Sequence, residues 1–160
     1  MKLVLPLVLV GSVGCAKEKT AENCGALSVT IDGQLLAATP HGLARRLMDT
    51  RAFEVQMFNH DKSTCEEFID RGGRFMVDKE VSVRAFAGGD GRMDKGVGLE
   101  ATTQAGGDVT VVTWPKVVGD PVAICADSVS FTANEGAHKG KKIEIKGLFT
   151  GKYCGEFTVN

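Results

Sequence analysis

Glycine-rich turns divide the second half of the sequence into short runs of β-prone residues. The clearest turn clusters are at residues 88–91, 106–108 and 119–121. Val, Ile, Thr and Phe are frequent between the turns, as in strands. We therefore expect strands at residues 75–77, 80–87, 96–103, 109–114, 123–132, 142–149 and 153–159. Short strands at this spacing predict an all-β fold, either an antiparallel β-sandwich or an open barrel.

The first half of the sequence adds three strands by the same reasoning. Residues 27–32 alternate between apolar and polar side chains, which predicts a half-buried strand. Asp32-Gly33 then favours a two-residue hairpin turn with a return strand over residues 35–39. Residues 53–58 alternate in the same way and predict the third strand.

One short helix is expected in the first half. Ser63 and Glu66 have the spacing of a capping box, and apolar residues follow at helical spacing until a glycine pair at residues 72–73. This pattern places Cys65 on the inward face of the helix.

A second segment has a weaker helical pattern. The apolar residues within residues 43–48 suit one or two helical turns. In that arrangement three arginines face solvent: Arg45, Arg46 and Arg51.

The N-terminus has the organisation of an export signal. Lys2 provides a short positive region, residues 3–10 form an apolar run, and small residues follow before Cys15. The run is far shorter than the roughly 20 residues that cross a bilayer, and Pro6 interrupts it. We therefore expect a signal peptide and no membrane-spanning helix.

The end of this signal, Ser12-Val13-Gly14-Cys15, resembles the lipobox of bacterial lipoproteins. The resemblance implies that residues 1–14 are removed and that Cys15 receives diacylglycerol and a fatty acyl chain such as palmitate. In such lipoproteins an aspartate after the cysteine often causes retention in the inner membrane, but Ala16 stands here. The implied location is the outer membrane, with the domain on its periplasmic or surface face.

Residues 15–23 are then a lipidated tether, because their composition is small and polar and lacks periodicity. Residues 24–160 form a single domain, since a mature chain of this length suits one ordinary core.

Four cysteines remain once Cys15 is set aside as the lipidation site: Cys24, Cys65, Cys125 and Cys154. An even number of cysteines in an oxidising compartment predicts two disulfides. The spacing has no CxxC motif and no paired Cys and His ligands, so a zinc site is not expected. The spacing leaves all three pairings open.

A further resemblance bears on that pairing. The first strand ends in Asp32-Gly33, a Phe-rich strand leads to the cysteine helix, and residues 146–154 read Lys-Gly-Leu-Phe-Thr-Gly-Lys-Tyr-Cys. This arrangement resembles small secreted or lipid-anchored bacterial β-sandwich proteins of unknown function. The resemblance implies a bond between Cys65 and Cys154, and therefore one between Cys24 and Cys125.

Net charge excludes one class of partner. The 19 basic residues fall to 18 when Lys2 leaves with the signal, against 20 acidic residues. There is no long block of either sign, so no nucleic-acid partner is expected.

No enzyme motif or cofactor site is recognisable in the sequence. It contains no GxSxG, HExxH or P-loop motif, and its three histidines, His41, His60 and His138, are in predicted turns. The acidic, glycine-rich residues 90–94 have oxygen ligands for calcium but lack the EF-hand pattern, so a hairpin turn is favoured. We expect no catalytic residue, metal or cofactor.

Trp114 is the candidate interface residue. It is the sole tryptophan and lies at the end of a predicted strand, beside Pro115. Such a residue is ordinarily a plug in the core or at a sheet edge, whereas an exposed tryptophan here would anchor an interface.

Two functional hypotheses follow. The first is a noncatalytic lipoprotein that binds another envelope protein, as an accessory or scaffold component of a machine for secretion, pilus assembly or surface motility. The alternative is a module that binds a small ligand or the cell wall. An apolar surface patch around Trp114 would favour the first, and a concave pocket with polar groups would favour the second.

Overall fold

The computed structural model describes residues 18–36, 39–59, 61–70, 82–89, 95–99 and 103–158. Strands dominate these residues, with two short helices. The helices are α1 (Ala21–Cys24) and α2 (Cys65–Asp70). The strands are β1 (Ser28–Ile31), β2 (Gln34–Leu35), β3 (His41–Leu47), β4 (Phe53–Phe58), β5 (Ser82–Ala87), β6 (Gly96–Leu99), β7 (Thr103–Ala105), β8 (Val109–Thr113), β9 (Pro121–Thr132) and β10 (Lys142–Phe157).

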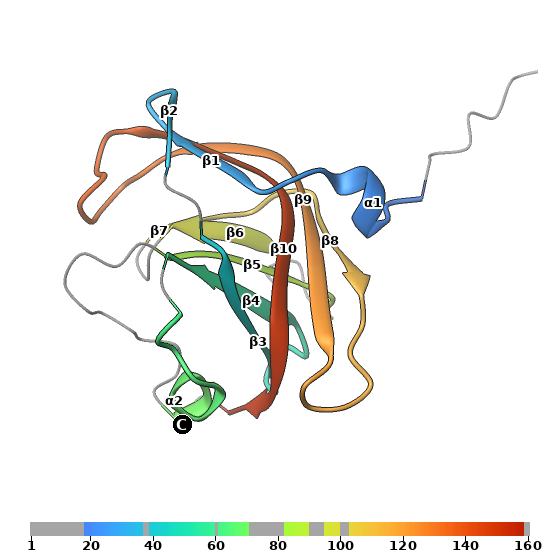
Figure 1. The fold of residues 1–160 in the computed structure, drawn as a ribbon. Coiled ribbons are helices and arrows are strands. Elements are labelled where there is room, and N and C mark those ends of the chain that lie inside the picture. The colour runs from blue at the N-terminus through green and yellow to red at the C-terminus, as the bar shows by residue number, and fades with distance from the viewer. Residues whose placement is uncertain are drawn as a thin grey trace, which may run out of the picture.

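The ten strands form one curled sheet, an open half-barrel (Figure 1). The order is β2-β1-β10-β3-β4-β5-β6-β7, with β9 also paired to β10 and β8 paired to β9. The expected all-β fold in its open-barrel form is therefore observed. The pairing of β10 with β3 is parallel, so the sheet is mixed rather than wholly antiparallel.

β10 is the central strand of this sheet, and the sequence predicted it as two strands. It pairs with β1 near its start, with β9 from Lys142 to Lys152, and with β3 from Lys152 to its end. The gap between the two predicted strands, residues 150–152, contains Gly151, which lets two backbones approach, because a Cβ at this position would lie 2.8 Å from the Leu43 carbonyl carbon. The two predicted strands are therefore one strand that continues through a glycine that close packing requires.

The concave side of the sheet contains the main core. Its largest fully buried side chains include Phe149, Ile124, Ile143 and Ile145. Alternate residues of β4 and β5 point into it, among them Val55 and Val83. This core fixes the register of the strands, because a slip by one residue would expose every apolar side chain.

The predicted helix at residues 43–48 is wrong, because β3 occupies this segment. Ala44 points into the main core, whereas Leu43 packs on the opposite face against Phe58 and Phe68. A strand covered on both faces has no simple apolar alternation, so the spacing of its leucines imitated a helix.

The expectation that all three arginines near this segment face solvent is wrong for Arg45. It is buried beneath α2, while Arg46 is half-buried and Arg51 is exposed. Burial of Arg45 is possible because Glu54 lies directly opposite it in the register of β3 and β4.

The predicted cysteine helix is present as α2, but its capping box starts one residue later than expected. The Thr64 hydroxyl accepts a hydrogen bond from the Glu67 N–H, and the Glu67 carboxylate accepts one from the Thr64 N–H. Ser63 is instead buried, and its carbonyl accepts a bond from the His41 ring. Residues 72–73 lie outside the described residues.

The remaining differences concern element ends. The expected strand over residues 96–103 is divided into β6 and β7, which pair with each other. The return strand expected over residues 35–39 is observed as β2, which ends at Leu35, and residues 37–38 lie outside the described residues. The expected strand at residues 75–77 lies outside the described residues.

Candidate functional site

Both disulfides are formed in the structure. Cys65 of α2 bonds to Cys154 near the end of β10, and Cys24 of α1 bonds to Cys125 of β9. This is the pairing that the resemblance to secreted β-sandwich proteins implied. Each bond attaches one short helix to the sheet, so the four cysteines have a structural role and no free thiol for chemistry.

Several residues that the sequence singled out are outside the described part of the chain. These are Cys15 with the rest of the lipobox, His60 and the acidic turn at residues 90–94. Of the other histidines, His41 lies at the start of β3, not in the expected turn, and His138 lies in the β9–β10 connection. Within the described ranges, no three His, Cys, Asp or Glu side chains are grouped to hold a metal ion.

Trp114 is exposed, and it is accompanied by two more exposed apolar residues of the β8–β9 loop. The exposed fractions are 58% for Trp114, 63% for Val117 and 65% for Val118. We call these three residues the Trp114 surface. Large exposed apolar side chains grouped on one loop are typical of interaction sites, whereas isolated ones are common on any protein.

The loop that carries this surface is held in one conformation by hydrogen bonds. The Asp120 carboxylate accepts from the N–H of Lys116 at 2.9 Å and from that of Val117 at 3.1 Å. These two bonds lower the pKa of Asp120 below its ordinary value. Two backbone bonds of 2.8 Å also join the loop to Tyr153 of β10, one from Gly119 and one to Asp120.

Trp114 itself is seated against the end of the barrel. Its ring makes an edge contact with Phe53, with 5.5 Å between centroids, and Phe53 also contacts Tyr153 at 5.8 Å. Gly88 lies under the ring, because a Cβ there would be 3.0 Å from the Trp114 Cη2 atom. One part of the ring is therefore fixed by the protein while the rest remains exposed.

Arg46 borders the same aromatic group. Its guanidinium carbon lies 5.8 Å from the Phe53 ring centroid, and its Nη1 lies 3.7 Å from a Glu156 carboxylate oxygen. Arginine beside aromatic residues is a frequent composition at the centre of protein interfaces. The sequence identified Trp114 as a candidate but not Arg46, because the predicted helix made Arg46 one of three arginines that face solvent.

A buried charged group beneath α2 was also missed by sequence reasoning. Arg45 contacts the Glu54 carboxylate at 2.7 and 2.8 Å, and its Nη1 donates to the Phe68 carbonyl at 3.3 Å. The guanidinium also lies over the rings of Phe68 and Phe157. The sequence did contain one indication of this pair. Glu54 is a charged residue within the apolar strand at residues 53–58, and a buried charge requires a partner of opposite charge.

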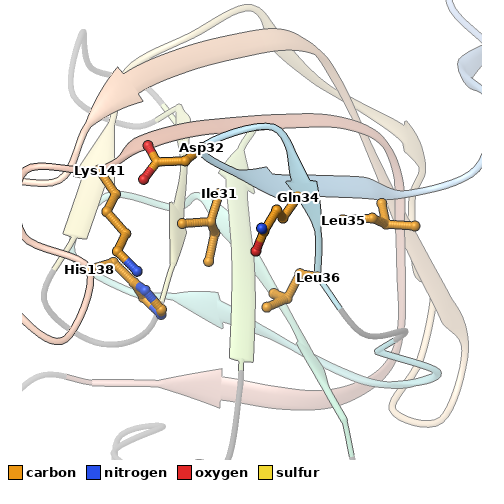
Figure 2. A pocket seen from close by; sticks show the side chains of 7 residues that line it. All are labelled: Ile31, Asp32, Gln34, Leu35, Leu36, His138 and Lys141. Atoms are coloured by element: carbon orange, nitrogen blue, oxygen red, sulfur yellow. The ribbon is translucent and has the colours of Figure 1, made fainter.

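A cleft of about 390 Å³ lies between the β1–β2 hairpin and the β9–β10 connection (Figure 2). Its lining combines apolar and polar side chains: Ile31, Asp32, Gln34, Leu35, Leu36, His138 and Lys141. The Asp32 carboxylate accepts from the Lys142 N–H at 2.8 Å. A concave pocket with polar groups is the feature that would favour the alternative hypothesis, a module that binds a small ligand.

The segment leading to the N-terminus is attached to the domain at Lys19. Its ammonium contacts the carboxylates of Asp108 and Asp127, which raise the Lys19 pKa, and Lys19 lowers the pKa of Asp108. Together with α1, this contact shortens the expected tether. Figure 1 shows α1 at one end of the β8–β9 hairpin and the loop with the Trp114 surface at the other.

In comparisons with protein-family models, with curated proteins and with solved structures, nothing matches the chain. Among the described residues, neither helix has the length and apolar character that crossing a membrane requires. A functional assignment therefore depends on the surfaces themselves.

Proposed function

We propose that this chain is a noncatalytic, lipid-anchored protein of the bacterial envelope that binds another envelope protein through the Trp114 surface. It would serve as an accessory or scaffold component of an envelope machine, of the kind that drives secretion, pilus assembly or surface motility. The observation that carries the proposal is an exposed tryptophan with two exposed valines on a hydrogen-bonded loop.

Preorganisation is what makes this loop suitable for binding. A flexible loop loses conformational freedom when it docks, at about 0.5–1.5 kcal/mol per immobilised side chain. Here Asp120 and Tyr153 already fix the backbone, and Phe53 already supports the indole ring. More of the free energy of apolar contact therefore remains as affinity.

The position of the surface favours a protein partner over the lipid surface. Cys15 is four residues before Lys19, so the chain between them can span at most about 14 Å, and Lys19 contacts Asp108 and Asp127. β8 then separates this contact from the Trp114 surface by five residues, roughly 17 Å. An anchor at one end of the hairpin leaves the other end available to a neighbouring protein.

Anchoring also reduces the affinity that the interface needs. Three acyl chains would hold the domain at the membrane, since two already give stable attachment. Two anchored partners meet at a high effective concentration, so a small interface is sufficient. Replacement of Cys15 by serine should abolish lipid labelling of the chain, and labelling that persists would contradict the anchor.

The direct test is crosslinking in membranes that contain the full lipidated chain, followed by affinity isolation and identification of the attached proteins. Trp114→Ala should reduce recovery of a specific envelope partner at least tenfold, because loss of a central aromatic anchor typically costs 2 kcal/mol or more. Leu35→Ala is the matched control, because Leu35 is an equally apolar residue with 73% exposure on β2. Equal recovery with wild type and Trp114→Ala would refute the proposed interface.

Gly88, which lies against the Trp114 ring, allows a second test that leaves Trp114 in place. Gly88→Ala introduces a Cβ against the indole ring, whereas Gly33→Ala introduces one into open space. Both glycines have nearly the same φ, +82° and +80°, so the backbone strain is matched. Gly88→Ala alone should lower partner recovery, and an equal loss in both variants would mean that strain rather than the ring position is responsible.

Intrinsic fluorescence distinguishes a protein from a lipid occupant, because Trp114 is the only tryptophan in the chain. Binding of the isolated partner should shift its emission to shorter wavelength and protect it from acrylamide quenching. The same response to vesicles of anionic and zwitterionic lipid, without the partner, would assign the surface to the membrane and contradict the proposal.

A further inference from the structure

The cleft in Figure 2 is distant in the fold from the Trp114 surface, and β10 connects the two regions. The cleft adjoins Lys142 at the start of β10, whereas the Trp114 loop is bonded to Tyr153 near its end. About 390 Å³ lies toward the lower end of the range of roughly 300–1,000 Å³ that small-molecule sites occupy. The cleft therefore suits a small ligand rather than a protein segment.

The backbone around the cleft is preformed. The Asp32 N–H donates to the Lys142 carbonyl at 2.8 Å, and the Leu36 N–H donates to the Val29 carbonyl at 2.8 Å. On the other side, the Lys141 N–H donates to the His138 carbonyl at 3.0 Å. Both walls are thus fixed by hydrogen bonds that do not involve a ligand.

The lining has a distinct chemical pattern. Ile31 and Leu36 are partly buried against the main core and provide an apolar wall. Asp32 provides an anion and Lys141 a cation, and neither forms an ion pair with another described residue. In Figure 2 Lys141 extends toward His138, while Leu35 points away from the other lining residues.

We propose that this cleft binds a small zwitterion with an apolar side chain, of the class of short free peptides. The ammonium group of the ligand would pair with Asp32, its carboxylate would pair with Lys141, and its apolar side chain would lie against Ile31 and Leu36. The Gln34 side chain can donate a hydrogen bond to, and accept one from, the peptide group that lies between the ammonium and carboxylate groups of the ligand. This site does not depend on the interface at Trp114, so the two can fail separately.

The test is an NMR titration of the full lipidated protein in detergent micelles with alanyl-leucine, followed through the backbone amides of Gly33, Gln34 and His138. A dipeptide of about 14 non-hydrogen atoms, at the efficiency of ordinary ligands, has an expected Kd on the order of 1 mM. N-acetylation and C-amidation of the peptide should each weaken binding about threefold, the range for one exposed charge pair.

Two variants assign each charge to its partner. Asp32→Asn keeps the acceptor for the Lys142 N–H and tolerates the φ of 49° at this position, but it removes the charge. It should bind the acetylated and free peptides equally. Lys141→Gln should bind the amidated and free peptides equally.

Matched controls use the same residue types outside the cleft. Asp49 also accepts a backbone N–H, and Lys139 is in the same turn as Lys141 without lining the cleft. Asp49→Asn and Lys139→Gln should leave the Kd unchanged. The absence of saturable shifts, or equal binding of free, acetylated and amidated peptides to the wild type, would overturn the proposal.

Discussion

The two faces of β4 are both buried, but by different means. Phe53, Val55 and Met57 point into the main core, where the sheet itself surrounds them with apolar side chains. Glu54 and Phe58 point to the other face, which only a six-residue helix covers among the described elements. The first face is stabilised by the amount of apolar surface it buries. The second has a small cluster and adds an ion pair and a disulfide to hold its cover in place.

Two phenylalanines with no exposed surface test this difference most directly. Phe149 belongs to the main core and Phe68 to the cluster beneath α2. Phe149→Ala should lower the free energy of unfolding by about 4–5 kcal/mol, because its rigid surroundings cannot collapse into the cavity. Phe68→Ala should cost about 3 kcal/mol, since the short helix can move inward. Urea unfolding measures both, and a larger loss for Phe68→Ala would reverse the comparison.

The ion pair beneath α2 can be compared with an exposed pair formed by the next arginine in the chain. Glu54 pairs with buried Arg45, whereas Glu156 lies near half-exposed Arg46. Glu54→Gln should cost about 3–5 kcal/mol, because it leaves a buried guanidinium without its counter-charge. Glu156→Gln should cost less than about 1 kcal/mol, because water screens an exposed pair. Similar midpoints of urea unfolding for the two variants would show that the buried pair is not needed to hold the α2 face.

The two disulfides sharpen the comparison because the loops they close are similar, with sequence separations of 89 and 101 residues. Chain entropy alone gives both about 4–5 kcal/mol, and measured effects are usually smaller. Removing Cys65–Cys154 by paired serine substitutions should also release α2, and hydrogen exchange should increase in β3 and β4. Removing Cys24–Cys125 should leave exchange there unchanged, because α1 has no buried residue of its own and lies against β9 and β10. Faster exchange in β3 after loss of Cys24–Cys125 would contradict this separation.

The same contrast explains what the sequence could predict. The main core follows from alternation and glycine turns, so the all-β class and most strand positions were predictable. β3 was not, because Ala44 and Leu43 serve opposite buried faces and their spacing resembles a helix. Arg45 was missed with it, since its partner Glu54 is opposite only once the two strands are paired.

The surfaces divide in a similar way. Trp114 was identifiable as the sole tryptophan beside a proline, but its exposure depends on the loop that Asp120 closes. The cleft was not predictable, because Asp32 was read as a turn residue and Lys141 lies between two predicted strands. The pairing of β1 with β10 brings together walls that are about 110 positions apart in the sequence. Local sequence patterns predict strands well. A site formed by residues that are brought together only when strands pair can be identified only once the fold is known.

The smallest expected effect concerns Asp120, a carboxylate that differs from Glu54. Asp120 is exposed and accepts hydrogen bonds from backbone N–H groups, whereas Glu54 is buried and pairs with a guanidinium. The folded pKa of Asp120 is lowered from the ordinary value of about 3.9, first by the bond from Lys116 and then by that from Val117. The stabilisation is therefore fully present above that ordinary value and is lost as pH falls through the lower, folded pKa.

Acidification should loosen the loop before it unfolds the domain. Below about pH 4, acrylamide quenching of Trp114 should increase while the far-ultraviolet circular dichroism of the sheet is unchanged. Asp120→Asn removes the titrating group but keeps an oxygen acceptor, so its quenching should not vary with pH over this range. A midpoint at or above the ordinary aspartate value, or the same transition in Asp120→Asn, would show that the carboxylate does not hold the Trp114 loop. The surface would then be flexible in the free protein, and part of the affinity expected from preorganisation would be lost.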